Sequence, residues 1–249
     1  MTDLTTPTRR TVVRSAAWTV PAVAASTAAP AFAASPCGTS YAWRVDWGAT
    51  GTSYTRGSTV SGVQTGSAVV TGPTGTAPMT VTFRSVMTGT MQRDADNLRL
   101  STDLTQTAAV ANVGATGGPG LNISHAAAIP SGSANAQELS ISFDRAVTGL
   151  AFTITDIDIS NGDWSDRVEL TGTRTGTATG VTGSGTGADP WRATNAGNAG
   201  NGANTRNLDV VYTAAIAANT PIVLRFWNAS GNSNQRIFLS DMTFTALGC

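Results

Sequence analysis

The sequence predicts an all-β protein in which two β-sheets pack face to face. Short runs of alternating apolar and polar residues recur along the chain, and Gly, Pro, Asn or Asp bounds each run. Gly and Thr are abundant and Leu is scarce, which favours strands and turns over helices. With 249 residues, 41% of them hydrophobic and 12% charged, the chain can bury a substantial core as a single domain.

Residues 1–33 resemble an export signal. Thr8–Arg14, TRRTVVR, places two adjacent arginines before apolar residues, and a weakly hydrophobic run, AAWTVPAVAA, follows. Ala31–Ala33, AFA, then supplies a small-x-small cleavage site. The apolar run is too short for a stable membrane-spanning helix, and Pro21 interrupts it. We predict removal of a twin-arginine-type signal peptide, which leaves residues 34–249 as an extracellular β-sandwich domain with no transmembrane segment; the alternative is a retained amphipathic anchor.

The charge balance argues against nucleic acid as a partner. The full chain has 15 basic and 15 acidic residues. Removal of residues 1–33 takes away three arginines and one aspartate, so the mature domain has 12 basic and 14 acidic residues and a net charge of about −2. Surfaces that bind polyanions usually carry a basic excess.

Two cysteines predict one disulfide that joins the ends of the mature domain. Cys37 lies just after the cleavage site and Cys249 is the last residue. Paired cysteines are typical of exported chains. Closing so long a loop contributes at most about 5 kcal/mol in the chain-entropy model. Such a bond places the first and last strands side by side, as in β-sandwiches and jelly rolls.

The predicted strands follow one another at short intervals. In the first, Tyr41, Trp43, Val45 and Trp47 alternate with polar or small residues. Later alternating sets are Met79, Val81 and Phe83; Leu139, Ile141 and Phe143; Leu208, Val210 and Tyr212; and Ile222, Leu224 and Phe226.

The most informative stretch is Gly149–Leu170, where two apolar strand patterns flank a charged segment. We call residues 156–166 the acidic loop; its four carboxylates belong to Asp156, Asp158, Asp163 and Asp166. Oxygen ligands at this density suit a calcium ion. The EF-hand pattern is absent, because Asn161 and Arg167 occupy the positions that require Gly and Glu. A solvated or backbone-capping loop and a pair of catalytic acids are the alternatives.

The last strand contains an irregularity that concerns the same candidate site. Ile237 and Leu239 share one parity and Met242 and Phe244 share the other, which predicts a bulge at Ser240 and Asp241. Asp241 is therefore either a fifth oxygen ligand or a side chain that caps the bulge.

Three tryptophans near polar loops suggest a carbohydrate contact. Trp164 lies in the acidic loop, Trp227 precedes Asn228, and Trp191 lies in the Gly-, Thr- and Asn-rich tract of residues 171–207. Indole rings stack on sugar faces while amides and carboxylates bind hydroxyl groups. Packing against the core is the alternative for each ring. We expect the Thr-rich first part of the tract to form an edge hairpin and its Asn-Gly part a surface loop.

Most catalytic motifs are missing from the sequence. His125 is the single histidine, and no GxSxG elbow, P-loop or dinucleotide fingerprint is present. We therefore assign no catalytic residues and favour a protein that is not an enzyme. The alternative is a carbohydrate-active enzyme that uses loop carboxylates, with Asp156 and Asp166 as the better pair.

The segments SISFDRAVTGLAFTITDIDISNGDWSDRVELTG and IFLSDMTF resemble jelly-roll domains of secreted and surface-attached bacterial proteins. The leader resembles actinobacterial twin-arginine signals. The likeness spans about Glu138 to Phe244 and implies an exported, jelly-roll-like sandwich that contacts glycans or cell-envelope polymers. It implies no catalytic residues. A non-enzymatic binding module is the leading interpretation, with a carbohydrate-active enzyme or a purely structural envelope protein as alternatives.

Overall fold

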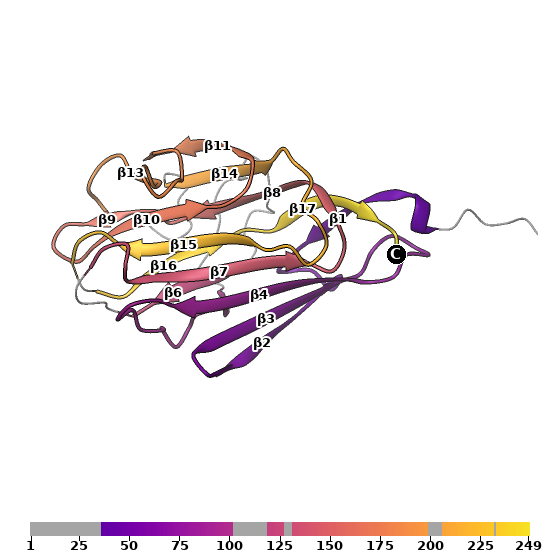
Figure 1. The fold of residues 1–249 in the computed structure, drawn as a ribbon, viewed down its shortest axis with the longest axis horizontal. Coiled ribbons are helices and arrows are strands. Elements are labelled where there is room, and N and C mark those ends of the chain that lie inside the picture. Colours follow the sequence, from indigo (N-terminus) through magenta and orange to yellow (C-terminus); the bar gives the residue numbers. More distant parts are fainter. Residues whose placement is uncertain (1–35, 102–118, 127–130, 199–205, 232) are drawn as a thin grey trace, which may run out of the picture. The chain divides into compact units, whose positions relative to one another are not determined.

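A computed structural model describes residues 36–101, 119–126, 131–198, 206–231 and 233–249. The proposed signal peptide lies outside the described residues. Pro36–Cys249 form one compact unit. The described residues form two large antiparallel sheets that pack face to face, with a 3-10 turn, Pro36–Gly38, at the start, so the predicted all-β sandwich is confirmed (Figure 1). Within the described ranges, no helix is long and apolar enough to cross a bilayer.

Sheet B forms one layer, with the strand order β2-β3-β4-β7-β15-β10-β9 (Figure 1). Its strands are β2 (Thr52–Val60), β3 (Val63–Val70), β4 (Met79–Met87), β7 (Ala136–Phe143), β15 (Ile222–Asn228), β10 (Trp164–Leu170) and the short β9 (Ile159–Ser160).

Sheet A forms the other layer and is organised around β8 (Val147–Thr155). On one side β8 pairs with β14 (Asn207–Tyr212), which pairs with the edge strand β11 (Arg174–Thr179). On its other side β8 pairs in turn with β17 (Met242–Leu247) and β16 (Gln235–Leu239). The outer neighbours are β1 (Ser40–Val45), which pairs with β17, and β6 (Gly120–His125), which pairs with β16 and the short β5 (Leu100–Ser101).

Alternation along the strands builds the core between the sheets. On β7, Leu139, Ile141 and Phe143 are fully buried while the intervening residues are partly exposed. Phe143 meets Phe244 of β17 across the layers, with ring centroids 5.1 Å apart. Because each strand turns alternate side chains inward, the two-residue period seen in the sequence corresponds to the face that packs.

The ends of the domain meet as the cysteines predict. Cys37 and Cys249 form a disulfide, with their Cα atoms 4.7 Å apart. Strands β1 and β17 pair from Ser40 opposite Leu247 to Val45 opposite Met242. The predicted first strand is therefore confirmed, although it ends at Val45 and Trp47 lies beyond it.

The predicted irregularity in the last strand separates β16 from β17. The Ser240 N–H donates to the Thr153 carbonyl at 3.0 Å, and the Ser240 hydroxyl accepts the Thr153 N–H at 2.9 Å. Asp241 accepts the Trp47 N–H at 3.0 Å and pairs with the Arg44 guanidinium at 2.6 Å. The side chain of Asp241 thus caps the break and ties it to β1.

The Gly-rich tract is held down by a buried indole. Its first part forms β11, an edge strand of sheet A, and β12 (Val181–Thr182) pairs with β13 (Arg192–Ala193). Trp191 is only 4% exposed. A Cβ atom on Gly185 would lie 2.4 Å from its ring and one on Gly176 would lie 3.2 Å away. Glycines occur there because the ring rests on the backbone.

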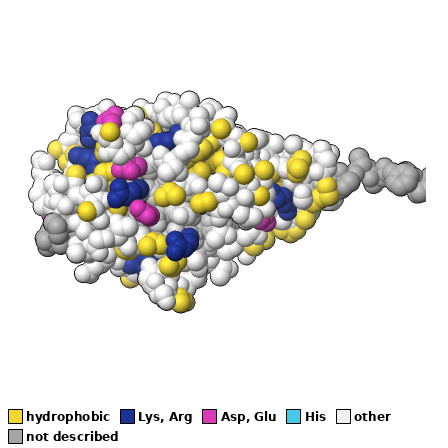
Figure 2. Space-filling view, viewed as in Figure 1, with side chains coloured by type: hydrophobic (Ala, Val, Ile, Leu, Met, Phe, Trp, Pro, Cys, Tyr) yellow, Lys and Arg dark blue, Asp and Glu magenta, His cyan; other side chains and the backbone are white. Residues whose placement is uncertain are grey.

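Charges on the outer face of sheet B form small mixed clusters. Acidic and basic side chains lie next to one another there, and most of the visible surface is uncharged (Figure 2). Arg225 of β15 pairs with Glu138 of β7 at 3.3 Å and with Glu169 of β10 at 3.7 Å. Such partly exposed pairs at the surface contribute about 1 kcal/mol each.

Candidate functional site

The acidic loop begins where β8 ends, at the end of the sandwich opposite the disulfide (Figure 1). Asp156 adopts a left-handed backbone conformation with φ of 68°, which turns the chain out of β8. Two backbone-directed bonds then fix the loop against β10. The Asp158 N–H donates to the Asp166 carboxylate at 3.0 Å, and the Asp166 N–H donates to the Asp158 carbonyl at 3.0 Å.

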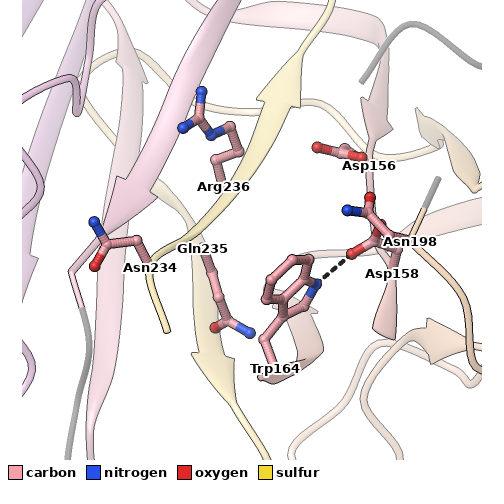
Figure 3. Close-up of a pocket in the computed structure, with 7 residues that line it drawn as sticks. All are labelled: Asp156, Asp158, Trp164, Asn198, Asn234, Gln235 and Arg236. Atoms are coloured by element: carbon pink, nitrogen blue, oxygen red, sulfur yellow. Dashed lines mark hydrogen bonds between the residues drawn. The ribbon is translucent and has the colours of Figure 1, made fainter. Parts of the chain in front are cut away.

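A polar pocket of about 290 Å³ lies between this loop and the start of β16 (Figure 3). Its lining residues are Asp156, Asp158, Trp164, Asn198, Asn234, Gln235 and Arg236. In Figure 3, Asp156, Asp158 and Asn198 lie on one side, Asn234, Gln235 and Arg236 lie on the other, and Trp164 lies between them. The pocket therefore joins segments about 40 to 80 residues apart in the chain.

Trp164 is held at the pocket by its indole N–H. The Nε1 atom donates to the Asp158 carboxylate at 2.6 Å, and the side chain is partly exposed. Because the N–H is already bound, the ring presents its apolar face and edge to a ligand.

Gln235 is the most unusual residue of the pocket. It is 4% exposed, and neither its Oε1 nor its Nε2 atom has a hydrogen-bond partner among the described residues. Its position in β16 turns its side chain toward the same face of the sheet as those of Ile237 and Leu239. In the strand register, Gln235 lies opposite His125 of β6. Leaving a buried donor and acceptor unpaired costs about 1–3 kcal/mol for each group. A ligand that pairs with both groups would recover this cost.

Asp156 contributes a third unsatisfied atom. The residue is 7% exposed, and its Oδ1 atom has no partner in the described part of the chain. Burial raises the pKa of Asp156 to about 8, and the nearby Asp158 adds to the shift, while Arg236 opposes it. The neutral carboxyl group is therefore the prevailing form at neutral pH, and it offers both a donor and an acceptor.

Asp166 lies deeper and does not line the pocket. It is 1% exposed, its Oδ1 atom has no partner among the residues described, and burial raises the pKa of its carboxyl group well above the ordinary value. The predicted catalytic pair of Asp156 and Asp166 is therefore not supported, because Asp166 lies out of reach of a ligand in the pocket. Asp156 and Asp158 are the two carboxyl groups that share the pocket.

The structure does not bring all five predicted oxygen ligands together. The Asp163 carboxylate accepts the exposed Ser160 hydroxyl at 3.1 Å, and both Asp241 oxygens are bound by Arg44 and Trp47. Across the described ranges, no group of three or more His, Cys, Asp or Glu side chains is arranged to hold a metal ion. Calcium binding by the acidic loop remains a prediction.

Two of the predicted ring contacts are buried. Trp191 packs in the core beneath Arg174, whose guanidinium lies 4.9 Å from the ring centroid, and Trp227 is 5% exposed. Neither ring offers a free face for stacking, which differs from the sequence-based expectation: Trp191 packs into the core and against the Gly-rich tract, and the Arg225 guanidinium lies 5.5 Å from the centroid of the buried Trp227 ring. Asn228 is also buried: its Oδ1 atom accepts the Ser165 N–H at 2.9 Å, and its Nδ2 donates to the Gly231 carbonyl at 2.9 Å. It shapes the loop after β15.

Sequence reasoning missed the wall of the pocket that β16 provides. Asn234, Gln235 and Arg236 lie about 75 residues after the acidic loop, and no short motif links the two segments. One signal was present: Gln235 is a polar residue at a position whose parity, shared with Ile237 and Leu239, faces inward. Comparison with protein-family models, curated proteins and solved structures finds no match to this chain.

Proposed function

We propose that this chain is an exported, non-enzymatic binding module of the cell surface or the extracellular space, and that its ligand enters the pocket between the acidic loop and β16. The observation that carries the proposal is Gln235, a buried amide with both polar atoms unpaired at a pocket. Folding leaves such a group unpaired at a cost, and a ligand with matching groups offsets it.

The lining of the pocket favours a glycan. A partly exposed indole, two carboxyl groups and several amides converge on a small volume. An indole packs against the C–H face of a sugar, and carboxyl and amide groups bind its hydroxyl groups. Cell-envelope polymers are rich in such groups, so a glycan or envelope polymer is the proposed partner.

Glycan-array binding with the mature protein tests the proposal. Trp164→Ala removes the exposed ring, and we expect it to abolish binding, since aromatic anchors dominate small polar sites. Tyr41→Ala is the matched control, because Tyr41 is a partly buried ring on β1, outside the pocket. Binding that survives Trp164→Ala, or that is lost equally in both variants, would argue against this site.

A carbohydrate-active enzyme is the second candidate, and one observation favours it. Asp156, whose pKa is raised to about 8, lines the same pocket as Asp158, and a carboxyl group that stays protonated at neutral pH is the usual general acid of glycoside hydrolysis. Release of reducing ends that Asp156→Asn abolishes, while the exposed Asp163→Asn leaves it intact, would establish an enzyme. No release from any glycan that binds would leave the binding module.

Export is part of the proposal. The disulfide between Cys37 and Cys249 is typical of proteins that fold or reside in an oxidising compartment. Mass spectrometry of the exported protein should show Ala34 as its first residue. A cell-associated chain that retains residues 1–33 would contradict cleavage of the signal.

A further inference from the structure

We infer that the pocket accepts a single neutral sugar residue and that Gln235 holds it through two neighbouring hydroxyl groups. This inference rests on the proposed function and names the ligand class of the same site.

The unpaired atoms define what the ligand must offer. Gln235 presents a donor, Nε2–H, beside an acceptor, Oε1, in one plane, and Asp156 adds its free Oδ1. Each hydroxyl group can donate and accept. Two hydroxyls on adjacent ring carbons therefore complement the amide: one accepts from Nε2–H while the other donates to Oε1. A simple anion would satisfy the donor and leave Oε1 unpaired.

The size of the pocket and its aromatic content point to one ring. A volume of about 290 Å³ lies at the lower limit of the roughly 300–1,000 Å³ found for drug-sized ligands. Extended or crystalline polysaccharides need several exposed rings in line. Here Trp164 is partly exposed, whereas Trp191 and Trp227 are 4% and 5% exposed. The single partly exposed indole at the pocket, that of Trp164, therefore provides a stacking surface for one sugar residue.

The charges of the lining favour a neutral sugar. Two carboxyl groups, of Asp156 and Asp158, face the pocket from the loop, and the Arg236 guanidinium belongs to the opposite wall. Because the Asp156 carboxyl group is neutral at neutral pH, the charged groups of the lining are Asp158 and Arg236, and an acidic sugar would meet Asp158 while a cationic sugar would meet Arg236. Like charges brought together at a binding site are costly, so a neutral residue with its hydroxyl groups is the best match.

Calorimetric titration of the mature protein tests the inference. The probes are methyl glycosides of glucose, mannose and galactose, their deoxy analogues that lack one of two adjacent hydroxyls, sulfated and amino analogues, and long neutral polysaccharides. We expect at least one neutral methyl glycoside to bind. Gln235→Met, which keeps the length of the side chain and removes both polar atoms, should lower that affinity about tenfold or more, as should the matching deoxy sugar. Asp163→Asn, a loop variant outside the pocket, should bind as the wild type does.

A second measurement uses the wild-type protein alone. The indole N–H resonance of Trp164, assigned through its own backbone and side-chain correlations in the isotope-labelled protein, should shift when the methyl glycoside is added. Binding of polysaccharides alone, preference for charged sugars, equal binding of the deoxy analogues, or an unmoved Trp164 signal would each overturn the inference and leave the binding module in place. Absence of binding to any glycan would refute the proposed function itself.

Discussion

The buried imidazole of His125 makes a quantitative prediction about acid stability. His125 is 1% exposed at the end of β6, and its ring lies 4.6 Å from that of Phe226. Its Nδ1 lies 3.2 Å from the Ala126 carbonyl, which can only accept, so Nδ1 carries the proton of the neutral ring. Nε2 has no partner among the described residues. Protonation would therefore bury an N–H and a positive charge without an acceptor.

The size of the effect follows from the pKa. Burial lowers the pKa of His125 from 6.5 to about 4. Between these two values the unfolded chain binds more protons than the folded chain, so the free energy of unfolding falls as pH falls through this window. At pH 5 the free energy of unfolding is about 2 kcal/mol lower than at pH 7.5, and most of this loss is recovered by pH 6.5.

Urea denaturation of the wild type and of His125→Gln at both pH values isolates this contribution. Asp156 acts in the opposite direction, because its raised pKa gives the folded chain more protons between pH 4 and 8 and so stabilises it as pH falls. The difference between the two proteins cancels that effect, and the wild type should lose about 2 kcal/mol more than the variant on acidification.

Proton NMR gives an independent reading, since His125 is the only histidine of the chain. Its ring resonances should stay constant from pH 7.5 to pH 5. A titration midpoint near 6.5 in the folded protein, or equal losses of stability in the two proteins, would refute the buried neutral state.

Three further predictions concern the backbone, the disulfide and the acidic loop. Gly185→Ala should destabilise the domain by about 3 kcal/mol or more, because the φ of Gly185 is 71° and the new Cβ would lie 2.4 Å from the Trp191 ring. The control is Gly75→Ala, at φ of 88° with open space around it, which should cost only about 1 kcal/mol. Equal losses of unfolding free energy in the two variants would contradict the packing of Trp191 against Gly185. Replacing Cys37 and Cys249 by serine should lower stability by at most about 5 kcal/mol, for a sequence separation of 212 residues; a melting temperature that is unchanged by reductant in the wild type would speak against a stabilising bond. Millimolar calcium should raise the melting temperature and a chelator should reverse the rise, whereas identical melts with and without calcium would argue against an ion in the acidic loop.

Much of the architecture was predictable because its signals are local. The two-residue period marks β1, β7 and β15, and the change of parity between Leu239 and Met242 locates the break that Ser240 and Asp241 fill. The disulfide followed from the positions of the two cysteines, and it implied the pairing of β1 with β17.

The site was predictable only in part, because it depends on contacts between distant segments. The acidic loop and Trp164 stood out by composition, whereas the opposite wall comes from β16, whose place beside the loop depends on the pairing with β8. The burial of the Trp191 ring depended on Gly176 and Gly185, which have no side chains and so leave room for it. A single sequence shows that such glycines are present but not which ring they accommodate.

The segment from Gln235 to Cys249, which contains β16 and β17, begins at the pocket and ends at the disulfide (Figure 1). The fifteen residues, eleven of them in the two strands, span about 40 Å. A linker or immobilising handle attached after Cys249 would therefore hold the pocket about 40 Å from the support and turned toward the solution. Sensor-chip measurements can use this geometry, since coupling through that end leaves the recognition end unobstructed.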